Sequence, residues 1–500
     1  MKAQNLLILT GLIPICIIGM GEIHAQYGCP PVSGGWHPQI STDQNNVYVF
    51  WNYFYGCGTR VLLFEKSNDN GVTFGNPVTL EDPANSGSYP VVVASNGNVY
   101  VSGINYISPS ERLFFKMSSD NGSSFTDAVE VNTNNTVQND VSNILVSKNN
   151  IGIVWTGISN QGLRSVFLNT STDGGKTFGN PVILTATTGD SYSPEAIQVG
   201  SKAYVLWSSI GNCNSARQEC ASQVYLTTMD IKNGFATDSI TSLGQLDLPR
   251  LAVFGNNVYV AGITSTSTDP SVGNSGVSFM KSSDGGTSFE KPVQLVTYEA
   301  GSNYLNGLAL DSSEDYVYIT WVDHDPHSGE KLLMTASTDD GNTFGKIQTL
   351  EGPDVHYNGN EGPYSLDQQI SVSGSKYYII WQSHTPLDPN GQGIFFRKST
   401  DGGQTLDDTT DMTNKIVISN PGYVIASNGN HIYIAGPEYA FKDGNHIVFS
   451  QSSDGGTTFS NSTDFDQNSI STVPEFPFAV PVMLIGLVAS LVFYSVKLRR

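Results

Sequence analysis

Charged residues are scarce in this sequence: aspartate, glutamate, lysine and arginine together make up 14% of its 500 residues. Helices rich in alanine, glutamate and lysine carry more charge than this, so the composition excludes a mainly helical protein. Glycine, with 51 residues, is abundant, and it accompanies many short strands joined by polar turns. The composition therefore predicts an all-β protein, and all-β folds of this length can form a single domain.

Positive charge is scarcer still. The chain has 24 lysines and arginines against 45 aspartates and glutamates, which gives a formal net charge of -21. An acidic field of this size repels nucleic acid, so we expect no nucleic-acid partner. The acidic residues are spread along the chain, which favours a solvated acidic exterior over a dedicated cation-binding surface.

Long apolar runs occur only at the two ends of the chain. Lys2 precedes the first run, Leu6 to Met20, and Ile23-His24-Ala25 follows it as a small-residue cleavage site. This pattern predicts a signal peptide over residues 1–25, whose removal would discard Cys16. Residues 26–36 would then lead into the folded part.

The second apolar run covers residues 476–496, long enough to cross a bilayer of ~30 Å. The basic tail 497–500 follows it, which places the C-terminus in the cytoplasm and the rest outside. The linker 466–475 ends in the stretch Val473-Pro474-Glu475-Phe476-Pro477-Phe478, which resembles the PEF-type sorting signal of archaeal exported proteins. That resemblance implies processing by an archaeosortase and attachment to a lipid; an ordinary membrane anchor is the alternative. Both place the protein on the outer face of the cell membrane.

Exported proteins commonly carry disulfides and glycans, and both have candidate residues. Four cysteines remain after Cys16, and of their three possible pairings we favour the two that are close in sequence. These are Cys29–Cys57 and Cys213–Cys220. Glycosylation sequons occur at Asn121, Asn134, Asn169 and Asn461.

One phrase recurs along the chain, Ser/Thr-x-Asp-x-Gly-x-Thr/Ser-Phe, and we call it the box. Alternating strands surround each copy, so that each unit has four strands, the signature of β-propeller blades. We predict eight units, with seven as the alternative, beginning near His37, Tyr89, Asn139, Ser193, Leu248, Asn303, Leu366 and Pro421. The box aspartates are Asp69, Asp120, Asp173, Asp284, Asp339, Asp401 and Asp454, with an eroded copy at Asp230.

The box has a physical role in the hairpin between the third and fourth strands. Its glycine supplies a positive φ angle, and its aspartate can accept hydrogen bonds from turn N–H groups and neighbouring hydroxyls. Its final phenylalanine can wedge between blades. The box aspartates are therefore structural and are not catalytic candidates.

The repeat resembles the Asp-box, or BNR, repeat of sialidases and related propellers, over residues 37–465. The resemblance implies a site with three arginines, a tyrosine paired with glutamate, and an aspartate acid/base. The Arg-Ile-Pro motif that supplies the first arginine is absent. Six arginines precede the C-terminal tail: Arg60, Arg112, Arg164, Arg217, Arg250 and Arg397. Four of them share the strand leading into the box, which leaves Arg217 and Arg250, too few for the triad.

The resemblance places the functional loops on the face opposite the boxes. The richest loops there carry Asp323, His324, Asp325, His327, His356, Tyr357, Glu361 and His384. Such side chains can bind a polar ligand or a divalent metal, although their spacing matches no established metal motif. Our preferred hypothesis is a non-catalytic, surface-anchored propeller that needs no cofactor and binds a glycan or a cell-envelope protein. The alternatives are an exo-α-sialidase-type glycoside hydrolase with a diverged site and a metal-dependent enzyme or assembly factor.

Overall fold

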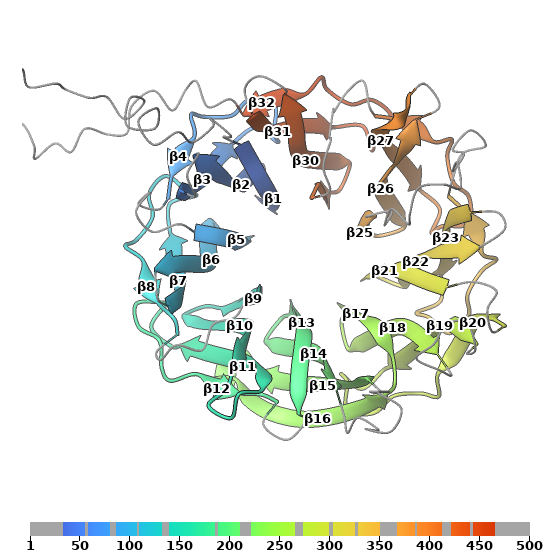
Figure 1. Cartoon of the computed structure of the whole chain (residues 1–500), viewed down its shortest axis with the longest axis horizontal. Coiled ribbons are helices and arrows are strands. Elements are labelled where there is room, and N and C mark those ends of the chain that lie inside the picture. The colour runs from blue at the N-terminus through green and yellow to red at the C-terminus, as the bar shows by residue number, and fades with distance from the viewer. Residues whose placement is uncertain are drawn as a thin grey trace, which may run out of the picture.

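A computed structural model describes residues 34–465, apart from 56–58, 81–86, 108–109, 133–139, 186–188, 211–221, 266–273, 300–303, 326–328, 351–367, 386–387, 413–421 and 441–443. Eight four-stranded antiparallel sheets stand around a central opening (Figure 1). The structure thus confirms the predicted all-β propeller with eight blades and excludes the seven-blade alternative. Strand β1 begins at Gly34, three residues before the predicted boundary at residue 37.

In each blade the chain runs outward from the channel. The innermost strands are β1 (Gly34–Asp43), β5 (Gly87–Ser95), β9 (Asp140–Ser147), β13 (Asp190–Val199), β17 (Asp247–Phe254), β21 (Tyr304–Ser313), β25 (Gln369–Ser373) and β29 (Val424–Asn428). The second strands are β2 (Asn46–Tyr55), β6 (Asn98–Ile107), β10 (Asn150–Ile158), β14 (Lys202–Ile210), β18 (Asn257–Ser265), β22 (Tyr316–Asp325), β26 (Lys376–Thr385) and β30 (His431–Ala440).

The third strands lead into the boxes and the fourth strands form the rim. The third strands are β3 (Thr59–Ser67), β7 (Ser110–Ser118), β11 (Arg164–Ser171), β15 (Ser222–Asp230), β19 (Ser275–Ser282), β23 (Gly329–Ser337), β27 (Asp388–Ser399) and β31 (Gly444–Ser452). The fourth strands are β4 (Val78–Thr79), β8 (Val129–Glu130), β12 (Val182–Ile183), β16 (Ala236–Gly244), β20 (Val293–Tyr298), β24 (Gln348–Thr349), β28 (Thr410–Asp411) and β32 (Thr463–Phe465).

The second strands are apolar on both faces because each blade packs against two neighbours. On β10, Ile151, Ile153 and Trp155 pack toward blade 2. Val154 lies on the opposite face and packs toward blade 4. Side chains alternate between the faces of a strand, so a strand between two blades must be apolar at successive positions. The hydrophobic core is therefore divided into separate seams between neighbouring blades.

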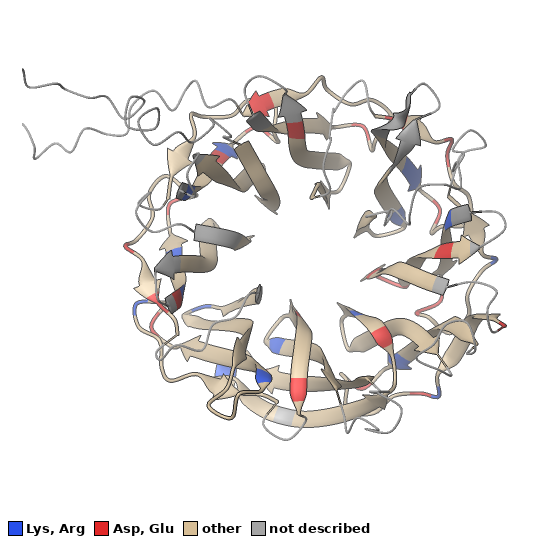
Figure 2. Ribbon diagram, in the orientation of Figure 1, with Lys and Arg blue, Asp and Glu red and all other residues tan. Residues whose placement is uncertain are grey.

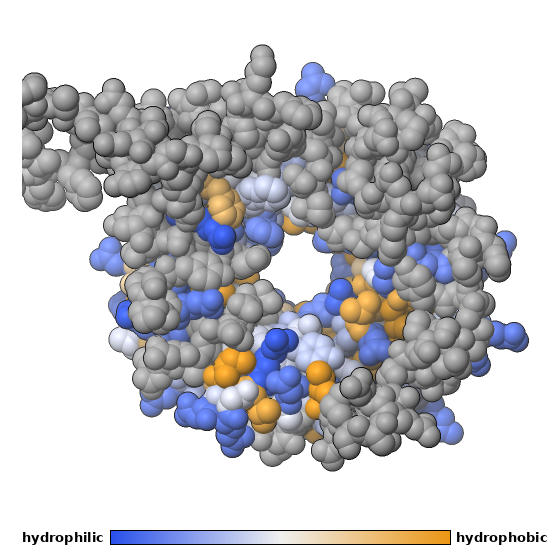
Figure 3. Space-filling model, viewed as in Figure 1, coloured by the Kyte–Doolittle hydropathy of each residue, from blue (hydrophilic) through white to orange (hydrophobic). Residues whose placement is uncertain are grey.

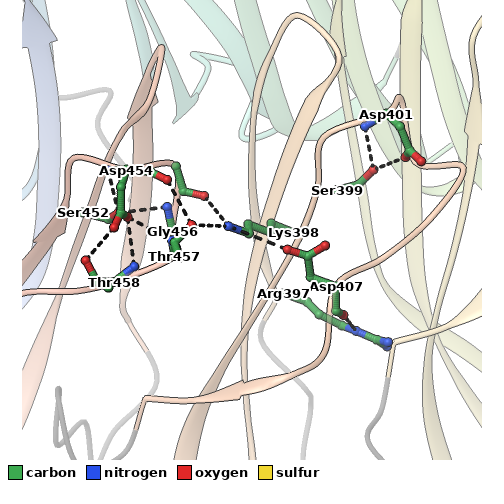
Figure 4. A network of polar contacts seen from close by, with 11 residues as sticks. Arg397, Lys398, Ser399, Asp401, Asp407, Ser452, Asp454, Gly456, Thr457 and Thr458 are labelled. Atoms are coloured by element: carbon green, nitrogen blue, oxygen red, sulfur yellow. Dashed lines mark hydrogen bonds and ion pairs between the residues drawn. The ribbon is translucent and has the colours of Figure 1, made fainter.

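Each box is held together by its aspartate and by the serine two residues before it. In blade 8 the Ser452 hydroxyl donates to Asp454 Oδ1 at 2.8 Å and accepts the Gly456 N–H at 2.8 Å (Figure 4). The same carboxylate accepts the Thr458 N–H at 2.9 Å and the Thr458 hydroxyl at 2.6 Å. These bonds lower the pKa of the box aspartates; in Asp173 the Thr177 hydroxyl and N–H and the Ser171 hydroxyl lower it to about 2. The predicted hydrogen bonding of the box is confirmed.

The box glycine forms a socket for the preceding blade. A Cβ on Gly175 would lie 2.2 Å from Phe115 Cε1 of blade 2, and one on Gly122 would lie 3.0 Å from Phe64 Cζ of blade 1. The last box residue packs edge-on against the same ring: Phe178 meets Phe115 at a centroid distance of 5.4 Å. The predicted wedge between blades is confirmed, and the glycine opposite it is what makes room.

The ring closes with this same socket rather than by exchanging a strand. Phe449 of blade 8 lies against Gly71 of blade 1, where a Cβ would come within 3.0 Å of its Cζ. A parallel bridge pairs Gly34 of β1 with Asn445 of β31. Asn428 donates from Nδ2 to the Gln44 carbonyl at 3.1 Å. Each blade is built from four consecutive strands, so closure depends on side-chain packing between the first and last blades together with these few hydrogen-bonded contacts.

A second contact between blades comes from the residue two positions before the box serine. Lys116 Nζ donates to the Leu80 carbonyl at 2.7 Å, and Arg397 Nη1 donates to the Leu350 carbonyl at 2.9 Å. Both carbonyls belong to the residue that directly follows the fourth strand of the preceding blade. Blade 1 has Glu65 at this position, 5% exposed, on the same face of β3 as Leu63, which packs in the closing seam. Burial raises the pKa of Glu65 to about 8.

Lysines immediately before the box serine join neighbouring boxes. Lys398 Nζ donates to the Gly455 carbonyl and to the Thr457 hydroxyl of the next blade, both at 3.0 Å (Figure 4). Lys66 makes the equivalent bond to the Asn121 carbonyl at 2.7 Å. Such bonds fix the angle between two successive blades on the box face.

We predict that Lys398→Met lowers the free energy of unfolding by about 1 kcal/mol, because the apolar stem is kept while two interblade hydrogen bonds and the 3.7 Å ion pair with Asp407 are lost. Urea denaturation followed by circular dichroism measures the change. The exposed Lys291, mutated to methionine, is the control. Equal effects of the two substitutions would show that the lysine bond between boxes contributes nothing.

Blade 4 carries the eroded box. Asp230 caps the short 3-10 helix η1 (Ile231–Asn233), with its side chain accepting the Lys232 N–H at 2.9 Å. The fourth strand β16 is nine residues long, compared with two or three in six of the other blades. Its pairing with β15 is interrupted by two register shifts. Such bulges blunt an exposed edge strand against pairing with another chain.

The predicted targeting segments 1–25, 466–475, 476–496 and 497–500 lie outside the described residues, as does most of the lead-in 26–36. Within the part of the chain that is described, no helix has the length and apolar character needed to cross a membrane.

Candidate functional site

The direction of the strands defines the two faces of the ring. The first and third strands end on the face that carries the boxes, so the loops after the second strands and those between blades share the opposite face, which we call the loop face. Most of these loops lie outside the described residues. Described parts include residues 159–163 of blade 3 and residues 245–246 between blades 4 and 5.

Two of the predicted site residues, Asp323 and His324, end strand β22 at the loop face. Both are buried, with exposures of 5% and 6%. Neighbouring residues on a strand point to opposite faces, so Asp323 shares its face with Trp321 in the seam to blade 5, and His324 shares its face with Val322 in the seam to blade 7. The structure thus places these two side chains in different seams.

Tyr298 is a site residue that the sequence reasoning missed. It ends the rim strand β20 of blade 5, and its hydroxyl donates to Asp323 Oδ2 at 3.0 Å. Lys331 is the cross-strand partner of Asp323 on β23. The arrangement places a carboxylate, a phenol and an ammonium-bearing residue near the loop end of one seam, where they can recognise a polar group. A tyrosine in a short rim strand gives no sequence signal, because the contact is made between blades.

For the other predicted ligand residues, the side chain or the whole residue lies outside the described part of the structure. Asp325 and His384 end strands β22 and β26, and their side chains lie outside the description. His327, His356, Tyr357 and Glu361 fall in the segments 326–328 and 351–367, outside the described residues. Among the residues that are described, no group of three histidine, cysteine, aspartate or glutamate side chains is arranged to hold a metal ion.

The arginines lie on separate blades. Arg60, Arg112 and Arg164 begin their third strands near the loop face, whereas Arg397 lies two residues before its box serine, so the four share a strand but not one position. The Arg60 guanidinium lies 4.4 Å from the centroid of the Phe54 ring, and Arg112 pairs with Glu130 at 2.9 Å on the surface. Arg217 falls outside the described residues.

Charged groups at the channel bind the backbone of the next blade. Glu195 Oε2 on β13 accepts the Leu251 N–H of β17 at 2.9 Å, and Arg250 Nε on β17 donates to the Leu308 carbonyl of β21 at 2.9 Å. Asp311 on β21 accepts the N–H of Val372 on β25. The inner strands leave backbone N–H and C=O groups unpaired at the edge that faces the channel. These side chains form hydrogen bonds with some of those groups.

The two channel carboxyls have raised pKa values. Burial raises the pKa of Glu195 to about 7, against the opposing effect of the Arg250 guanidinium. Burial also raises the pKa of Asp311 to about 7, and the charge of Glu195 adds to this. Sequence reasoning singled out Arg250 alone, because charged residues within short inner strands are not marked by any motif.

A further polar cluster lies in blade 8. His446 Nδ1 lies 3.0 Å from Asp464 Oδ2, and Glu438 is the cross-strand partner of His446. Burial, with the nearby charge of Asp464, raises the pKa of Glu438. These three residues lie near the loop end of blade 8, on the face that packs toward blade 7.

Of the predicted modification sites, some lie on the exposed surface, one is buried, and the others fall outside the described residues. Asn121, with a φ of 56°, and Asn461 are exposed on box hairpins or next to them. Asn169 is 1% exposed, and its Nδ2 donates to the Val131 and Gly179 carbonyls at 2.5 and 2.9 Å. The fold therefore disfavours the glycan predicted at Asn169. Asn134, Cys29, Cys57, Cys213 and Cys220 lie outside the described residues.

The charge of the ring is dispersed. Acidic and basic residues are distributed over all parts of the ribbon without collecting on one blade (Figure 2). The space-filling view shows the ring open at its centre, with hydrophilic and hydrophobic residues both reaching the wall of the opening (Figure 3).

No protein-family model and no curated protein sequence matches this chain. Solved structures similar to it include a Hadza microbial sialidase, with a TM-score of 0.35 and 12% identity over 58% of this chain and 63% of that one. A puromycin-hydrolyzing peptidase of Mycobacterium tuberculosis has a TM-score of 0.47 and 10% identity over 79% of this chain and 55% of that one. A polysaccharide lyase, an ulvan lyase, has a TM-score of 0.42 and 10% identity over 87% and 94%.

The chain spans less than two thirds of the length of the first two of these proteins. At these scores the similarity assigns no activity, and the propeller itself is established by the strands described above.

Proposed function

We propose that the protein is an exported, surface-anchored propeller that binds a glycan or a cell-envelope ligand through its loop face without catalysing a reaction. One observation carries the proposal: the box aspartates and three charged residues of the inner strands bind groups of the protein itself. The box aspartates close their own hairpins, and Glu195, Arg250 and Asp311 bind the backbone of the next blade. The polar residues at the loop ends of blades 5 and 6 are left to recognise a ligand.

The anchoring part of the proposal is supported by sequence alone. The signal peptide over 1–25 and the apolar run over 476–496 would export the chain and hold it at the outer face of the membrane. The resemblance of residues 473–478 to an archaeal PEF sorting signal adds an archaeosortase as a processing partner. The mass of the protein isolated from membranes tests this, because cleavage at the motif removes the apolar run and an uncleaved anchor retains it.

We predict that Asp323→Asn weakens ligand binding about tenfold, because the buried carboxylate that Tyr298 contacts would lose its charge. Glycan arrays and isolated cell envelopes identify the ligand, and biolayer interferometry then measures its affinity. Lys176→Met, at an exposed position in a box, is the control on the opposite face and should bind as the unaltered protein does.

Fluorogenic sialosides and other glycosides, incubated with the same preparation, separate binding from catalysis. The proposal expects saturable binding without turnover. Turnover that disappears when carboxylates of the loop face are replaced would instead establish a glycoside hydrolase and overturn the proposal.

A further inference from the structure

The seam between blades 6 and 7 departs from the repeat at one buried position. The inner strands can be aligned by their pairing with the second strands, for example Gln39↔Phe50, Ala309↔Thr320 and Gln369↔Ile380. The residues just before these aligned positions are, from blade 1 to blade 8, Pro38, Pro90, Ser142, Pro194, Pro249, Leu308, Gln368 and Tyr423. Blade 7 alone carries a carboxamide where most blades close the seam with an apolar side chain.

Gln368 is buried in this seam without a hydrogen-bond partner for its carbonyl. The residue is 7% exposed, and its Oε1 accepts no hydrogen bond within the described structure. The amide lies against blade 6 beside Gly307, where a Cβ would come within 3.0 Å of both Gln368 Oε1 and Val322 Cγ2. The absence of a side chain at Gly307 therefore makes the space that the glutamine amide occupies.

Among the described residues, five more polar atoms of the same seam are buried without partners: the hydroxyls of Tyr318 and Tyr377, toward the box end, and three atoms closer to Gln368. Asn306 is paired with Val322 and shares its face, and its Oδ1 is unbonded. Thr320 lies two residues before Val322 on that face, 0% exposed, and its hydroxyl is unbonded. Trp381 follows Ile380, the partner of Gln369, so it stands beside Gln368; its indole Nε1–H is unbonded and the residue is 0% exposed.

These four side chains, which we call the seam site, present two carbonyl oxygens, a hydroxyl and an N–H donor. Buried polar groups in folded proteins are nearly always hydrogen-bonded, so a cluster of this kind calls for a bound group that completes it. A cation is disfavoured because the indole N–H can only donate a hydrogen bond. An anion is disfavoured because the two carbonyl oxygens can only accept one. A hydroxyl both donates and accepts, and hydroxyls on adjacent carbons match the seam site.

We infer that the seam site binds a hydroxyl-bearing unit of a neutral carbohydrate, entering from the loop end of the channel where β21 and β25 lie side by side (Figure 1). The inference rests on the proposed function and gives it a ligand class and a second position, separate from Asp323 in the seam to blade 5. Asn306 and Gln368 accept the hydroxyl protons, and Trp381 donates to a hydroxyl oxygen.

The test replaces Gln368 by the residue that blade 6 uses, in the variant Gln368→Leu. The probes are a neutral-glycan array, and for the glycan it selects, calorimetric titration of the full chain with that purified oligosaccharide. We expect affinity to fall at least tenfold in Gln368→Leu while the thermal midpoint without sugar stays the same or rises, because the unbonded amide has been removed. Gln369→Leu, at the next residue and on the opposite face of the strand, is the matched control and should retain binding.

A second readout identifies the atom involved. The indole N–H resonance of Trp381, assigned by comparison with Trp381→Phe in ¹⁵N-labelled protein, should shift on addition of the oligosaccharide and should not shift in Gln368→Leu. If the protein binds glycans and Gln368→Leu binds them equally, the seam site holds only structural water and this inference is wrong, whereas the proposed function stands. If the unaltered protein binds neither glycan nor envelope, the proposed function fails and this inference fails with it.

Discussion

Replacing Glu65 by glutamine is expected to raise the free energy of unfolding at pH 7 by about 2 to 3 kcal/mol, and to leave it almost unchanged near pH 4. Burial in the closing seam raises the pKa of this carboxyl from 4.5 to about 8. In the unfolded chain it ionises near pH 4.5, whereas the folded protein holds the proton up to about pH 8. The contribution of Glu65 to the free energy of unfolding is therefore fully present below pH 4.5, and it is lost progressively as the pH rises to about 8.

Glutamine at this position keeps the shape and remains neutral at every pH, so this loss disappears from the variant. Thermal or urea denaturation between pH 4 and pH 9 measures this loss as the difference in the free energy of unfolding between Glu65→Gln and the unaltered protein. Glu290→Gln, at an exposed position, controls for removing one charge from a chain of net charge -21. Equal curves for the two variants would show that Glu65 is solvated in the folded protein.

Glu195 and Asp311 also have raised pKa values, about 7 in the folded protein, so the unaltered protein loses further stability as the pH rises from about 4 to about 7. The box aspartates act in the opposite direction. Their pKa values are lowered, to about 2 in Asp173, so their contribution is present above pH 4 and is lost as the pH falls toward 2. The protein is therefore expected to be most stable in mildly acidic solution, near pH 4 to 5.

Gly175→Ala is expected to lower the free energy of unfolding by about 3 to 4 kcal/mol. The residue has a φ of +83°, and the new Cβ would lie 2.2 Å from Cε1 of Phe115, a fully buried ring of the preceding blade. Either the ring moves and opens the seam, or the hairpin shifts and breaks its own hydrogen bonds. Chemical denaturation of the purified variants measures the cost.

The neighbouring glycine provides a matched control. Gly174 has a φ of +78°, but a Cβ there would meet nothing within 4 Å. Gly174→Ala should therefore show the backbone cost alone, about 1 kcal/mol. Phe115→Leu combined with Gly175→Ala should recover part of the loss, because a smaller side chain leaves room for the new methyl group. Equal losses for the two glycine variants would show that the socket has no part in joining the blades.

Much of the fold could be predicted from residues that repeat. The eight boxes, at near-constant spacing, favoured eight blades over seven and gave the third-to-fourth-strand hairpin and the role of Asp173 and its equivalents. This worked because the hydrogen bonds of a box run between residues two to four positions apart, so the local sequence contains both partners. The inward wedge of Phe178 was also predictable, since an apolar residue at the same place in every unit must be buried between units.

The candidate site was much less predictable. Asp323 and His324 were named together because they are adjacent in sequence, and the structure separates them because adjacent residues of a strand face different seams. Tyr298, Glu195 and Gln368 were missed, since each acts on a residue of another blade. Only the aligned register of the strands shows that Gln368 replaces the prolines and the leucine of other blades.

The sequence by itself thus determined the all-β class and the four-stranded unit and favoured eight blades over seven, because these follow from hydrogen bonds and side-chain alternation within a few residues. Only the tertiary structure decided how the ring closes, which acids are buried, and which polar groups share a seam. Those properties depend on contacts between blades. In neighbouring blades such contacts join residues some fifty positions apart in sequence. At the closure they join residues near opposite ends of the ring, as in the bond from Asn428 to Gln44. No local pattern contains both partners of such a contact.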